Sequence, residues 1–378
     1  MSILAKKLPK KIEIPGFIKE NAVLVIAIIA ALATSFIIPP DAKYLEYFDL
    51  KTLSCLFCVL AVVCALRNIR FFYTLAREIV RRFKNSRVAI LALVYITFIG
   101  SMLIANDMAL LTFLPLGYFI LHTTKKKKYL AFTFIMQNIA ANLGGMLTPF
   151  GNPQNLYLYS KFNIPDGEFV SIMFPPFILA IALITVCCLV FVKKEALEIE
   201  ETEVKLPVGR VIVYLGLFAI AILMVFRFMP FWIGLIIIPL ALLFLDKKAL
   251  LQVDYGLLFT FVFFFIFAGN MGRIGAVRDF FSYLLNINTL VFSAMSCQFI
   301  SNVPSAILLS QFTDNYRELL LGVNIGGAGT LIASLASLIT FKEYTKQEPT
   351  RVKDYVVKFS LFNFGFLAIL TVFCLILL

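Results

Sequence analysis

The sequence predicts an all-α polytopic membrane protein built from two inverted repeats. Three features predict this class: the composition, the length of the apolar runs, and a series of elements that occurs twice. Of 378 residues, 61% are hydrophobic and 15% are charged, and the mean hydropathy is +0.93. That composition excludes a soluble globular protein. Several apolar runs approach the roughly 20 residues that a helix needs to cross a bilayer.

The start of the chain predicts a cytoplasmic tail followed by a retained first span. Residues 1–20 are basic, and no small-residue cleavage site follows the apolar run 21–38. A cleaved signal peptide would carry such a site. We therefore expect the run 21–38 to stay in the membrane.

The stretch 129–160 organises the rest of the chain. It is uncharged and long enough to span, yet its centre holds two prolines and three glycines among several amide side chains. Proline and glycine interrupt the helical hydrogen-bond ladder, and each freed backbone group in hydrocarbon costs about several kcal/mol unless it finds a partner. This pattern predicts a broken helix whose half-helix ends face a polar cavity at the membrane midplane. Such a cavity would bind a small ion.

The same series of elements occurs twice along the chain. We expect a tail at 1–20, a first repeat at 21–192, a cytoplasmic linker at 193–206 and a second repeat at 207–378. The first repeat contains a hairpin at 88–124 and a broken helix at 129–160, and the second contains a hairpin at 288–313 and a broken helix at 318–341. Each repeat also has an amphipathic interfacial helix, at 67–84 and 273–285. The matching residues are Asn142, Gly144, Gly145 and Thr148 with Asn324, Gly326, Gly327 and Thr330, and Asn106 with Asn302.

The distribution of basic residues predicts the orientation in the membrane. With nine full spans and a cytoplasmic N-terminus, 27 of the 34 Lys and Arg residues lie inside and seven lie outside. This agrees with the positive-inside rule and puts the C-terminus outside. The basic net charge of +12 is thereby explained by topology, so we expect the bilayer and no nucleic acid as partner. We expect the plasma membrane, the inner membrane of a bacterium, as its location.

Two tripeptides mark the expected hairpin tips. Asp107, in Ala105-Asn106-Asp107, is the only acidic or basic residue of an apolar run, and a carboxylate near the bilayer centre costs about 2.5–3.5 kcal/mol. One interpretation is a re-entrant hairpin whose tip reaches the midplane, with Asp107 as cation ligand or proton carrier. The other is two ordinary spans with Asp107 at an outer turn. The absence of a turn-rich loop favours the hairpin, and Ser301-Asn302-Val303 allows the same two interpretations.

We predict two groups of site residues around the breaks and the tips. Half-helix N-termini and amides would bind an anionic substrate, because the positive ends of helix dipoles favour anions. The expected substrate-binding residues are Asn106, Asn152, Pro153, Asn155, Asn302, Thr330 and Ser334. The expected coupling-ion residues, with Na⁺ as a possible metal, are Asp107, Asn142, Gly144, Thr148, Ser301, Asn324 and Gly326. Close helix packing is the alternative role of the paired glycines.

These motifs resemble the ion transporter superfamily. The resemblance rests on Asn106-Asp107, the segment from Thr148 to Leu156, and the segment from Ser301 to Ser305. That group includes citrate-type permeases, divalent-anion/sodium symporters, arsenical pump membrane subunits and NhaD-type antiporters, and the chain is most similar to compact bacterial permeases. The resemblance implies inverted repeats, hairpins that meet broken helices, elevator-like movement and a homodimer. Divalent-anion tips typically read Ser-Asn-Thr; both threonines are missing here, and the Asn-Asp tip looks more like the arsenical-pump branch.

The sequence thus predicts a secondary active transporter of a small, anionic ion, carboxylate or inorganic, coupled to Na⁺ or H⁺. The alternatives are an arsenite or antimonite exporter and a Na⁺/H⁺ antiporter, and more remotely a channel or membrane enzyme. His122 is the single histidine, and the seven cysteines lie in apolar segments without metal-ligand spacing. With no nucleotide-binding glycine loop either, we expect no enzyme and no cofactor. A partner ATPase is compatible with the sequence.

Overall fold

The computed structural model describes residues 21–196 and 206–378. Within these ranges the chain is almost entirely helical, without strands; one isolated bridge joins Asn85 to Ala196. Seven of the described helices are long and apolar enough to cross a membrane, by length and composition, and three shorter apolar helices accompany them. The predicted all-α polytopic class is confirmed. The predicted tail at 1–20 and most of the predicted linker lie outside the described residues.

The helices repeat one order of elements. After α2 (Ala22–Ile37), the first series is α3 (Leu50–Asn68), α4 (Phe71–Arg81), α5 (Ser86–Ile104), α6 (Asn106–Thr123), α7 (Leu130–Gly144), α8 (Pro153–Lys161) and α9 (Asp166–Phe191). The connecting helices are α10 (Val208–Val225), α11 (Phe231–Leu245) and α12 (Lys247–Leu251). The second series is α13 (Tyr255–Arg273), α14 (Gly275–Ile287), α15 (Thr289–Ile300), α16 (Asn302–Leu309), α17 (Tyr316–Ile325), α18 (Leu335–Gln347) and α19 (Val352–Leu377).

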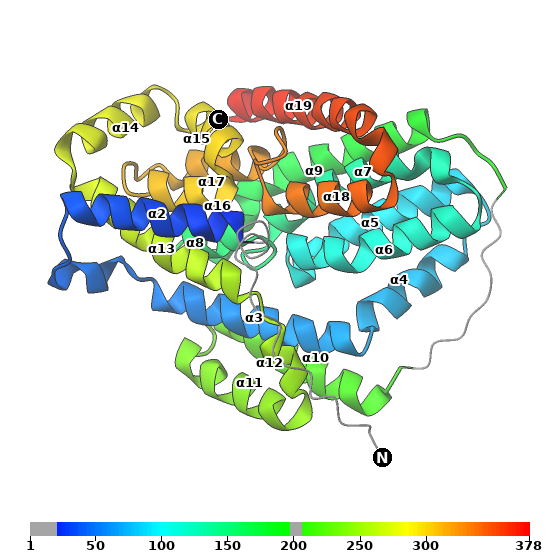
Figure 1. Cartoon of the computed structure of the whole chain (residues 1–378), viewed down its shortest axis with the longest axis horizontal. Helices are drawn as coiled ribbons and strands as arrows, with labels where there is room; N and C mark the ends of the chain where they lie inside the picture. The colour runs from blue at the N-terminus through cyan, green and yellow to red at the C-terminus, as the bar shows by residue number, and fades with distance from the viewer. Residues whose placement is uncertain (1–20, 197–205) are drawn as a thin grey trace, which may run out of the picture.

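The two series run in opposite directions. In Figure 1 the hairpin α5–α6 extends from the centre to the right-hand end of the molecule, and the hairpin α15–α16 lies to the left of the centre. The broken helices follow the same inversion, because α7 and α18 lie on the right of the centre whereas α8 and α17 lie on the left. Both hairpins therefore turn back at the centre of the molecule.

Corresponding helices begin with the same capping residues. The side chain of Asp49 accepts a hydrogen bond from Thr52 N at 2.9 Å at the start of α3, and Asp254 accepts one from Leu257 N at 2.9 Å at the start of α13. Asparagine caps the first arm of each hairpin, at Asn85 for α5 and at Asn288 for α15. An Asp or Asn at this position satisfies a backbone N–H that has no partner in the helix. The two series therefore match in the capping residues of their helices as well as in the breaks.

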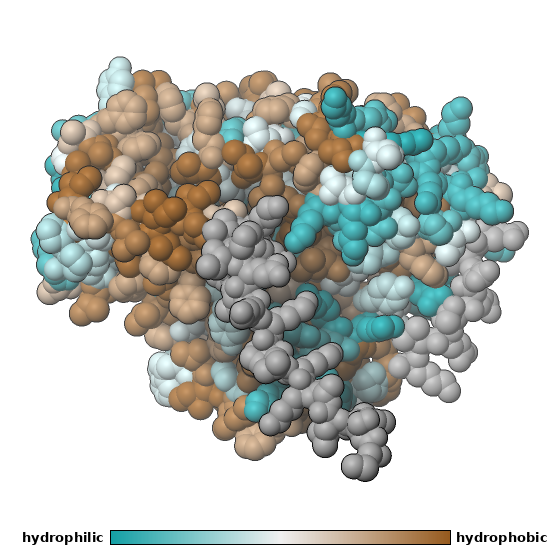
Figure 2. Space-filling model, in the orientation of Figure 1, coloured by the Kyte–Doolittle hydropathy of each residue, from teal (hydrophilic) through white to brown (hydrophobic). Residues whose placement is uncertain are grey.

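A second group of helices flanks the hairpins and broken helices. α3 packs against α10 and α11 along the lower side of Figure 1, and α2 packs lengthwise against α13. The amphipathic helices α4 and α14 fall within or close to the predicted interfacial segments. Hydrophilic side chains gather over the right-hand end of the molecule and apolar ones over the left and middle, as Figure 2 shows. The right-hand end includes the lysine-rich turn 125–128 between α6 and α7, which agrees with a cytoplasmic location for this end.

Candidate functional site

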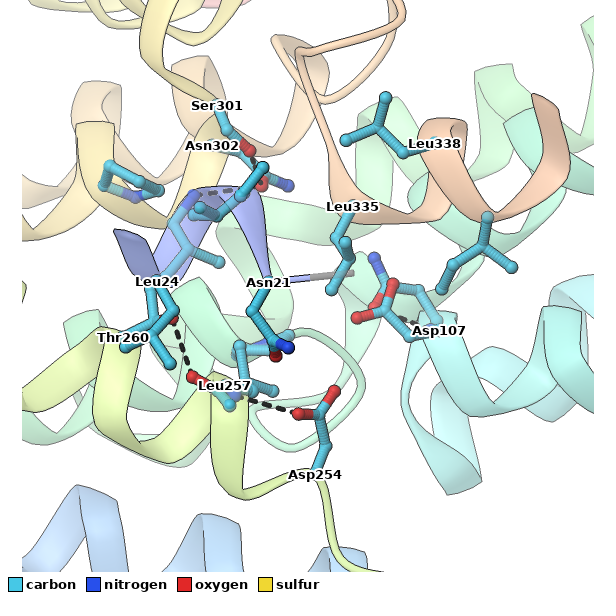
Figure 3. A pocket seen from close by; sticks show the side chains of 18 of the residues that line it. Asn21, Leu24, Asp107, Asp254, Leu257, Thr260, Ser301, Asn302, Leu335 and Leu338 are labelled. Carbon is cyan, nitrogen blue, oxygen red and sulfur yellow. Dashed lines mark hydrogen bonds between the residues drawn. The ribbon is translucent and has the colours of Figure 1, made fainter. Parts of the chain in front are cut away.

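A cavity of about 430 Å³ lies where the two hairpin tips meet the two broken helices. Figure 3 shows its lining from close by. The hairpin tips contribute Asn106, Asp107, Ser301, Asn302, Val303 and Pro304, and the broken helices contribute Pro153, Gln154, Leu335, Leu338, Ile339 and Lys342. The remaining polar residues of the lining come from α2 and α13, and they are Asn21, Asp254 and Thr260. The cavity therefore collects residues from both repeats.

The two hairpin tips have the same backbone geometry. Ala105 has φ 65° and ψ 150°, and Ser301 has φ 71° and ψ 159°. A positive φ is unfavourable for residues other than glycine, by about 1–3 kcal/mol, and persists only where neighbouring structure imposes it. Here the imposing contacts are equivalent: Asn106 N donates to Gly151 O at 3.1 Å, and Asn302 N donates to Ala333 O at 2.9 Å. Each tip is thus bonded to the break of the broken helix in its own repeat.

Four helix N-termini converge on the cavity. α6, α16, α8 and α18 begin at Asn106, Asn302, Pro153 and Leu335, and all four first residues line it. Each N-terminus carries the equivalent of roughly half a positive charge. The side-chain oxygens of the two tip asparagines accept hydrogen bonds from the next backbone N–H, both at 2.9 Å, so each asparagine directs its amide NH₂ group away from its own helix. The arrangement favours an anion at the centre.

Three ionisable side chains complete the lining: Asp107, Asp254 and Lys342. Asp107 Oδ1 is buried and has no hydrogen-bond partner among the described residues. Asp254, expected from the sequence to be only a span-end residue, caps α13 and also faces the cavity (Figure 3). Asn21 and Asp254 both lie beside Gly256. A Cβ atom placed on this glycine would be 2.8 Å from Asn21 Oδ1 and 3.2 Å from Asp254 Oδ1, so the two side chains are close to each other. Two carboxylates from different elements therefore share one cavity.

Four of the predicted residues form a buried amide cluster outside the cavity lining: Asn142, Asn152, Asn155 and Asn324, each at most 2% exposed. Asn152 Nδ2 donates to Asn324 Oδ1 and to Asn142 O, both at 3.1 Å. Asn324 Nδ2 donates to Asn155 Oδ1 at 2.6 Å. These bonds join the two broken helices across the repeats. Asn106 joins the cluster to a hairpin tip by donating to Asn142 Oδ1 at 3.3 Å.

Three amide atoms in and beside the amide cluster keep unused hydrogen-bonding capacity. Asn152 Oδ1, Gln154 Oε1 and Asn142 Nδ2 are buried and have no partner within the described structure. A buried polar group without a partner costs about 1–3 kcal/mol, so such atoms call for a ligand, an ion or water. Gln154 itself lines the cavity. Two of the three atoms are oxygens, the ligand type that Na⁺ and other hard cations prefer.

Three further predicted residues bond to the hairpins or cap a helix and do not line the cavity. Thr148 Oγ1 donates to Met102 O at 2.7 Å in the first repeat. In the second repeat Thr330 donates through Oγ1 to Gln298 O at 3.1 Å and through its backbone N to Gln298 Oε1 at 2.9 Å. Ser334 caps α18 and bonds Ser337 Oγ at 2.9 Å. Each of these bonds positions the backbone of a break.

The predicted glycines serve close helix packing. A Cβ on Gly144 would lie 2.2 Å from Phe98 O on α5, and one on Gly326 would lie 2.8 Å from Cys297 Sγ on α15. Each glycine thus brings the first half of a broken helix against the first arm of its hairpin. This is the packing role left open by the sequence, and neither glycine contributes to the cavity wall.

Five residues of the predicted site line the cavity: Asn106, Asp107, Pro153, Ser301 and Asn302. The sequence did not indicate Asn21, Thr260 or Lys342. Their position at the cavity depends on the packing of α2, α13 and α18, which no local pattern reveals. For Gln154 and Asp254 a signal was present, since one is an amide inside the break and the other an acidic residue at the start of an apolar run.

Two inverted series of helices whose hairpins meet broken helices around a polar cavity are typical of a membrane transporter. The comparisons agree: the chain belongs to the citrate transporter family, whose model matches residues 15–316. The predicted resemblance to the ion transporter superfamily is thereby confirmed, as is a multi-pass membrane protein. The chain is 35% identical over 298 residues to the uncharacterised transporter MJ0456 of Methanocaldococcus jannaschii, covering 77% of this chain and 80% of the relative. It is 28% identical over 327 residues to the inner membrane protein YbiR of Escherichia coli, covering 83% and 86%.

Proposed function

We propose that this chain is a secondary active transporter of a small anion, carboxylate or inorganic, coupled to Na⁺ or H⁺. The observation that carries the proposal is the convergence of four helix N-termini on one cavity of about 430 Å³. That volume is within the usual range for small-ligand sites, roughly 300–1,000 Å³. Asn106 and Asn302, which both line the cavity, would orient the anion. As a carrier, the protein is not an enzyme and needs no cofactor.

Coupling follows from the carboxylates. An ionised Asp107 and Asp254 would repel an anion in the cavity, by about 1–4 kcal/mol per pair at 4 Å. A proton on Asp107, or Na⁺ held by Asp107, Ser301 and Gln154 Oε1 at the cavity, would lower that repulsion. The cation and the anion then favour each other's binding, which is the thermodynamic condition for symport.

An elevator movement fits the division of the helices. The hairpins and broken helices are tied together by tip-to-break hydrogen bonds and by the amide cluster, so they would move as one transport unit. α2, α3, α10, α11 and α13 would form the scaffold, with a homodimer as the expected assembly. The cavity extends from the tips along α18 through Leu338 to Lys342, towards the basic end of the molecule. We infer that the described conformation is open to the cytoplasm.

The unpartnered carboxylate of Asp107 favours a second candidate. An Asn-Asp tip with a free carboxylate oxygen would also suit a Na⁺/H⁺ antiporter or an exporter of arsenite or antimonite. In such a transporter the carboxylate of Asp107 would itself bind the transported cation or the coupling proton. Resistance to arsenite and tolerance of sodium in cells that express the chain separate these activities from anion uptake.

The deciding experiment is a thermal-shift panel on the detergent-purified protein. Citrate, succinate, sulfate, phosphate and arsenite are each added with and without sodium. A ligand at 100 times its dissociation constant adds about 2.7 kcal/mol of stability. Stabilisation by one anion that depends on sodium or on low pH supports the symporter. A response to sodium or pH alone, with no response to any anion, contradicts it and favours the antiporter.

A further inference from the structure

A second cavity, of about 330 Å³, lies between the α3–α4 corner and α6. Its lining consists of Arg67 and Arg70 from the corner, Phe72 and Tyr73 from the first turn of α4, and Leu111, Thr112 and Pro115 from α6. The lining thus includes two arginines and no acidic residue. Its chemistry therefore differs from that of the cavity at the hairpin tips, which carries two carboxylates.

The arginines of this cavity lack anionic partners. Neither Arg67 nor Arg70 forms an ion pair within the described residues, whereas Arg81 and Arg82 at the other end of α4 both pair with Glu78, at 2.9 and 3.7 Å. Within the described residues the side chain of Arg67 donates to Met108 Sδ at 3.5 Å, and a thioether is a weak acceptor. A half-buried guanidinium without an acceptor is unfavourable, and a bidentate oxyanion satisfies it best.

The start of α4 adds a further positive group to the same cavity. Arg70 is the N-cap residue of this 11-residue helix, in a left-handed conformation with φ 58°, and no side chain caps the helix. The first-turn residues Phe72 and Tyr73 line the cavity. The uncapped N–H groups and the dipole of α4 therefore reinforce the two arginines at one place.

The position of the cavity suits the phosphate level of a membrane. Arg67 lies in the last turn of α3 at the basic end, and α4 leaves Leu75 and Ile79 exposed, at 49% and 38%. A helix that exposes apolar side chains beside arginines lies in the interface between lipid tails and headgroups. Basic pockets between helices on the cytoplasmic side bind anionic headgroups.

We propose that this cavity binds a phosphate group, held by Arg67, Arg70 and the N-terminus of α4. The two sources of that chemistry are the headgroup of an anionic phospholipid and free inorganic phosphate. Leu111 lines this cavity and the cavity at the hairpin tips alike, so the bound phosphate sits beside the arm of the first hairpin. The site does not depend on which ion the transporter carries.

The test compares two double variants with equal loss of charge. Arg67→Gln/Arg70→Gln removes the two cavity arginines, and Arg81→Gln/Arg82→Gln removes two arginines of α4 outside the cavity. Each protein is delipidated in detergent and titrated with dioleoylphosphatidylglycerol, dioleoylphosphatidylcholine, inorganic phosphate or sodium chloride while thermal stability is recorded. Lipid retention is measured in parallel by native mass spectrometry.

We expect the wild type and the Arg81→Gln/Arg82→Gln variant to be stabilised, and the affinity of Arg67→Gln/Arg70→Gln to fall at least tenfold. Stabilisation by phosphatidylglycerol identifies the lipid as the source, and stabilisation by inorganic phosphate identifies the soluble ion. Equal affinity in the two double variants, or no stabilisation of the wild type beyond that of sodium chloride, overturns the proposal. If the double variant does not fold, the single variant Arg70→Gln, at an exposed position, replaces it in the test. We then expect the affinity for the stabilising ligand to fall at least threefold.

Discussion

At the scale of single residues, polar side chains inside the membrane region are the expensive choices, and their partners show what each one does. Asn324 accepts a hydrogen bond from Asn152 Nδ2 and donates one to Asn155 Oδ1, so these amides hold the broken helices together. Asp107 Oδ1 and Gln154 Oε1, in contrast, are buried and have no partner in the described part of the chain. Polar groups with hydrogen-bond partners stabilise the fold, whereas polar groups without partners at a cavity are available to a ligand.

Asp107→Asn tests the coupling role. The substitution keeps the shape and removes the titratable charge, so we expect flux driven by a pH gradient to fall at least tenfold while thermal stability stays within a few degrees. The measurement is uptake into proteoliposomes with imposed gradients. Asp279→Asn, at a side chain that is 80% exposed, is the matched control. Unchanged flux in Asp107→Asn would remove this carboxylate from the mechanism.

Asn324→Ala tests the amide cluster. In a buried place, the change removes the donor to Asn155 Oδ1 and one of the two acceptors of Asn152 Nδ2, which keeps its bond to Asn142 O. Each such loss costs about 1–3 kcal/mol, so we expect a clear decrease in the midpoint of thermal unfolding. Asn68→Ala removes an exposed bond to Asp246 and should change stability by no more than about 0.5 kcal/mol. Equal effects in the two variants would contradict the structural role of the cluster.

The sequence indicated the region of the site better than the orientation of each side chain. Asn106 and Asn302 were recognisable because an amide at the centre of an apolar run is costly and usually has a functional role. Asn152 and Asn155 lie in the same break as Pro153 and Gln154, but they turn into the cluster and not into the cavity. That direction depends on Asn324, 169 residues or more away along the chain. No local pattern contains such a contact.

At the scale of elements, each broken helix and its hairpin form one packed unit. Glycine at the contact permits the close approach of α7 to α5 and of α17 to α15, and the tip hydrogen bonds fix the relative position of hairpin and break. The existence and the type of these elements followed from the sequence. Their ends did not: the interfacial helix predicted at 67–84 is Phe71–Arg81, because α3 continues to Asn68 and a left-handed Arg70 separates the two helices.

Gly144→Ala tests this packing. The new Cβ would lie 2.2 Å from Phe98 O, a backbone atom, so α5 and α7 must separate. Such overpacking costs about 1–3 kcal/mol, and we expect lower thermal stability together with loss of transport. Gly216→Ala in α10 meets nothing within 4 Å and should be neutral or stabilising by up to about 1 kcal/mol. A Gly144→Ala protein as stable as wild type would refute the packing role.

Glu195 links the end of α9 to the turn between α6 and α7 at the basic end. Its carboxylate accepts hydrogen bonds from Lys126 at 2.6 Å and Lys128 at 2.5 Å, and these bonds lower the pKa of Glu195 from 4.5 to about 2. A lowered pKa in the folded state means that the contribution to stability is present above pH 4.5 and is lost as the pH falls towards 2.

Glu195→Gln should therefore flatten part of the acid dependence of stability. We expect the difference in unfolding midpoint between wild type and variant to be largest above pH 5 and to shrink steadily between pH 4.5 and pH 2. The pair is partly exposed, so the difference will be small. Thermal unfolding at a series of pH values measures it, and a constant difference across that range would contradict the assigned pKa.

At the scale of the whole molecule, the inversion of the repeats gives the two ends of the protein equivalent positions relative to the cavity. The first hairpin enters from the basic end and the second from the opposite end, and both tips meet at one cavity (Figure 1). In the proposed elevator, whose cavity extends towards the basic end, contacts at the opposite end would hold the described conformation. The order of elements in the two repeats was predictable from the motifs. The set of closing contacts was not, since it joins loops of different repeats.

Arg227 is the clearest of these closing contacts. It lies between α10 and α11 and donates to Tyr159 O at 2.7 Å and Ile164 O at 3.1 Å, at the junction of α8 and α9. Its guanidinium carbon also lies 4.0 Å from the centre of the Tyr159 ring. Hydrogen bonds from a charged donor are each worth about 1.5–3 kcal/mol. In an elevator these bonds must break before the cavity opens to the other side.

Arg227→Gln should consequently shift the conformational equilibrium away from the cytoplasm-open state. A cysteine introduced at Leu338, in the cavity wall, reports on this state through its labelling by a membrane-impermeant maleimide in inside-out vesicles. We expect labelling to slow at least threefold when Arg227→Gln is added, and to stay unchanged with Arg278→Gln, at a side chain that is 62% exposed. Protein without the introduced cysteine gives the background from the seven native cysteines. If Arg227→Gln lowers thermal stability but leaves labelling unchanged, Arg227 is a static brace, and α8 does not separate from the α10–α11 loop during transport.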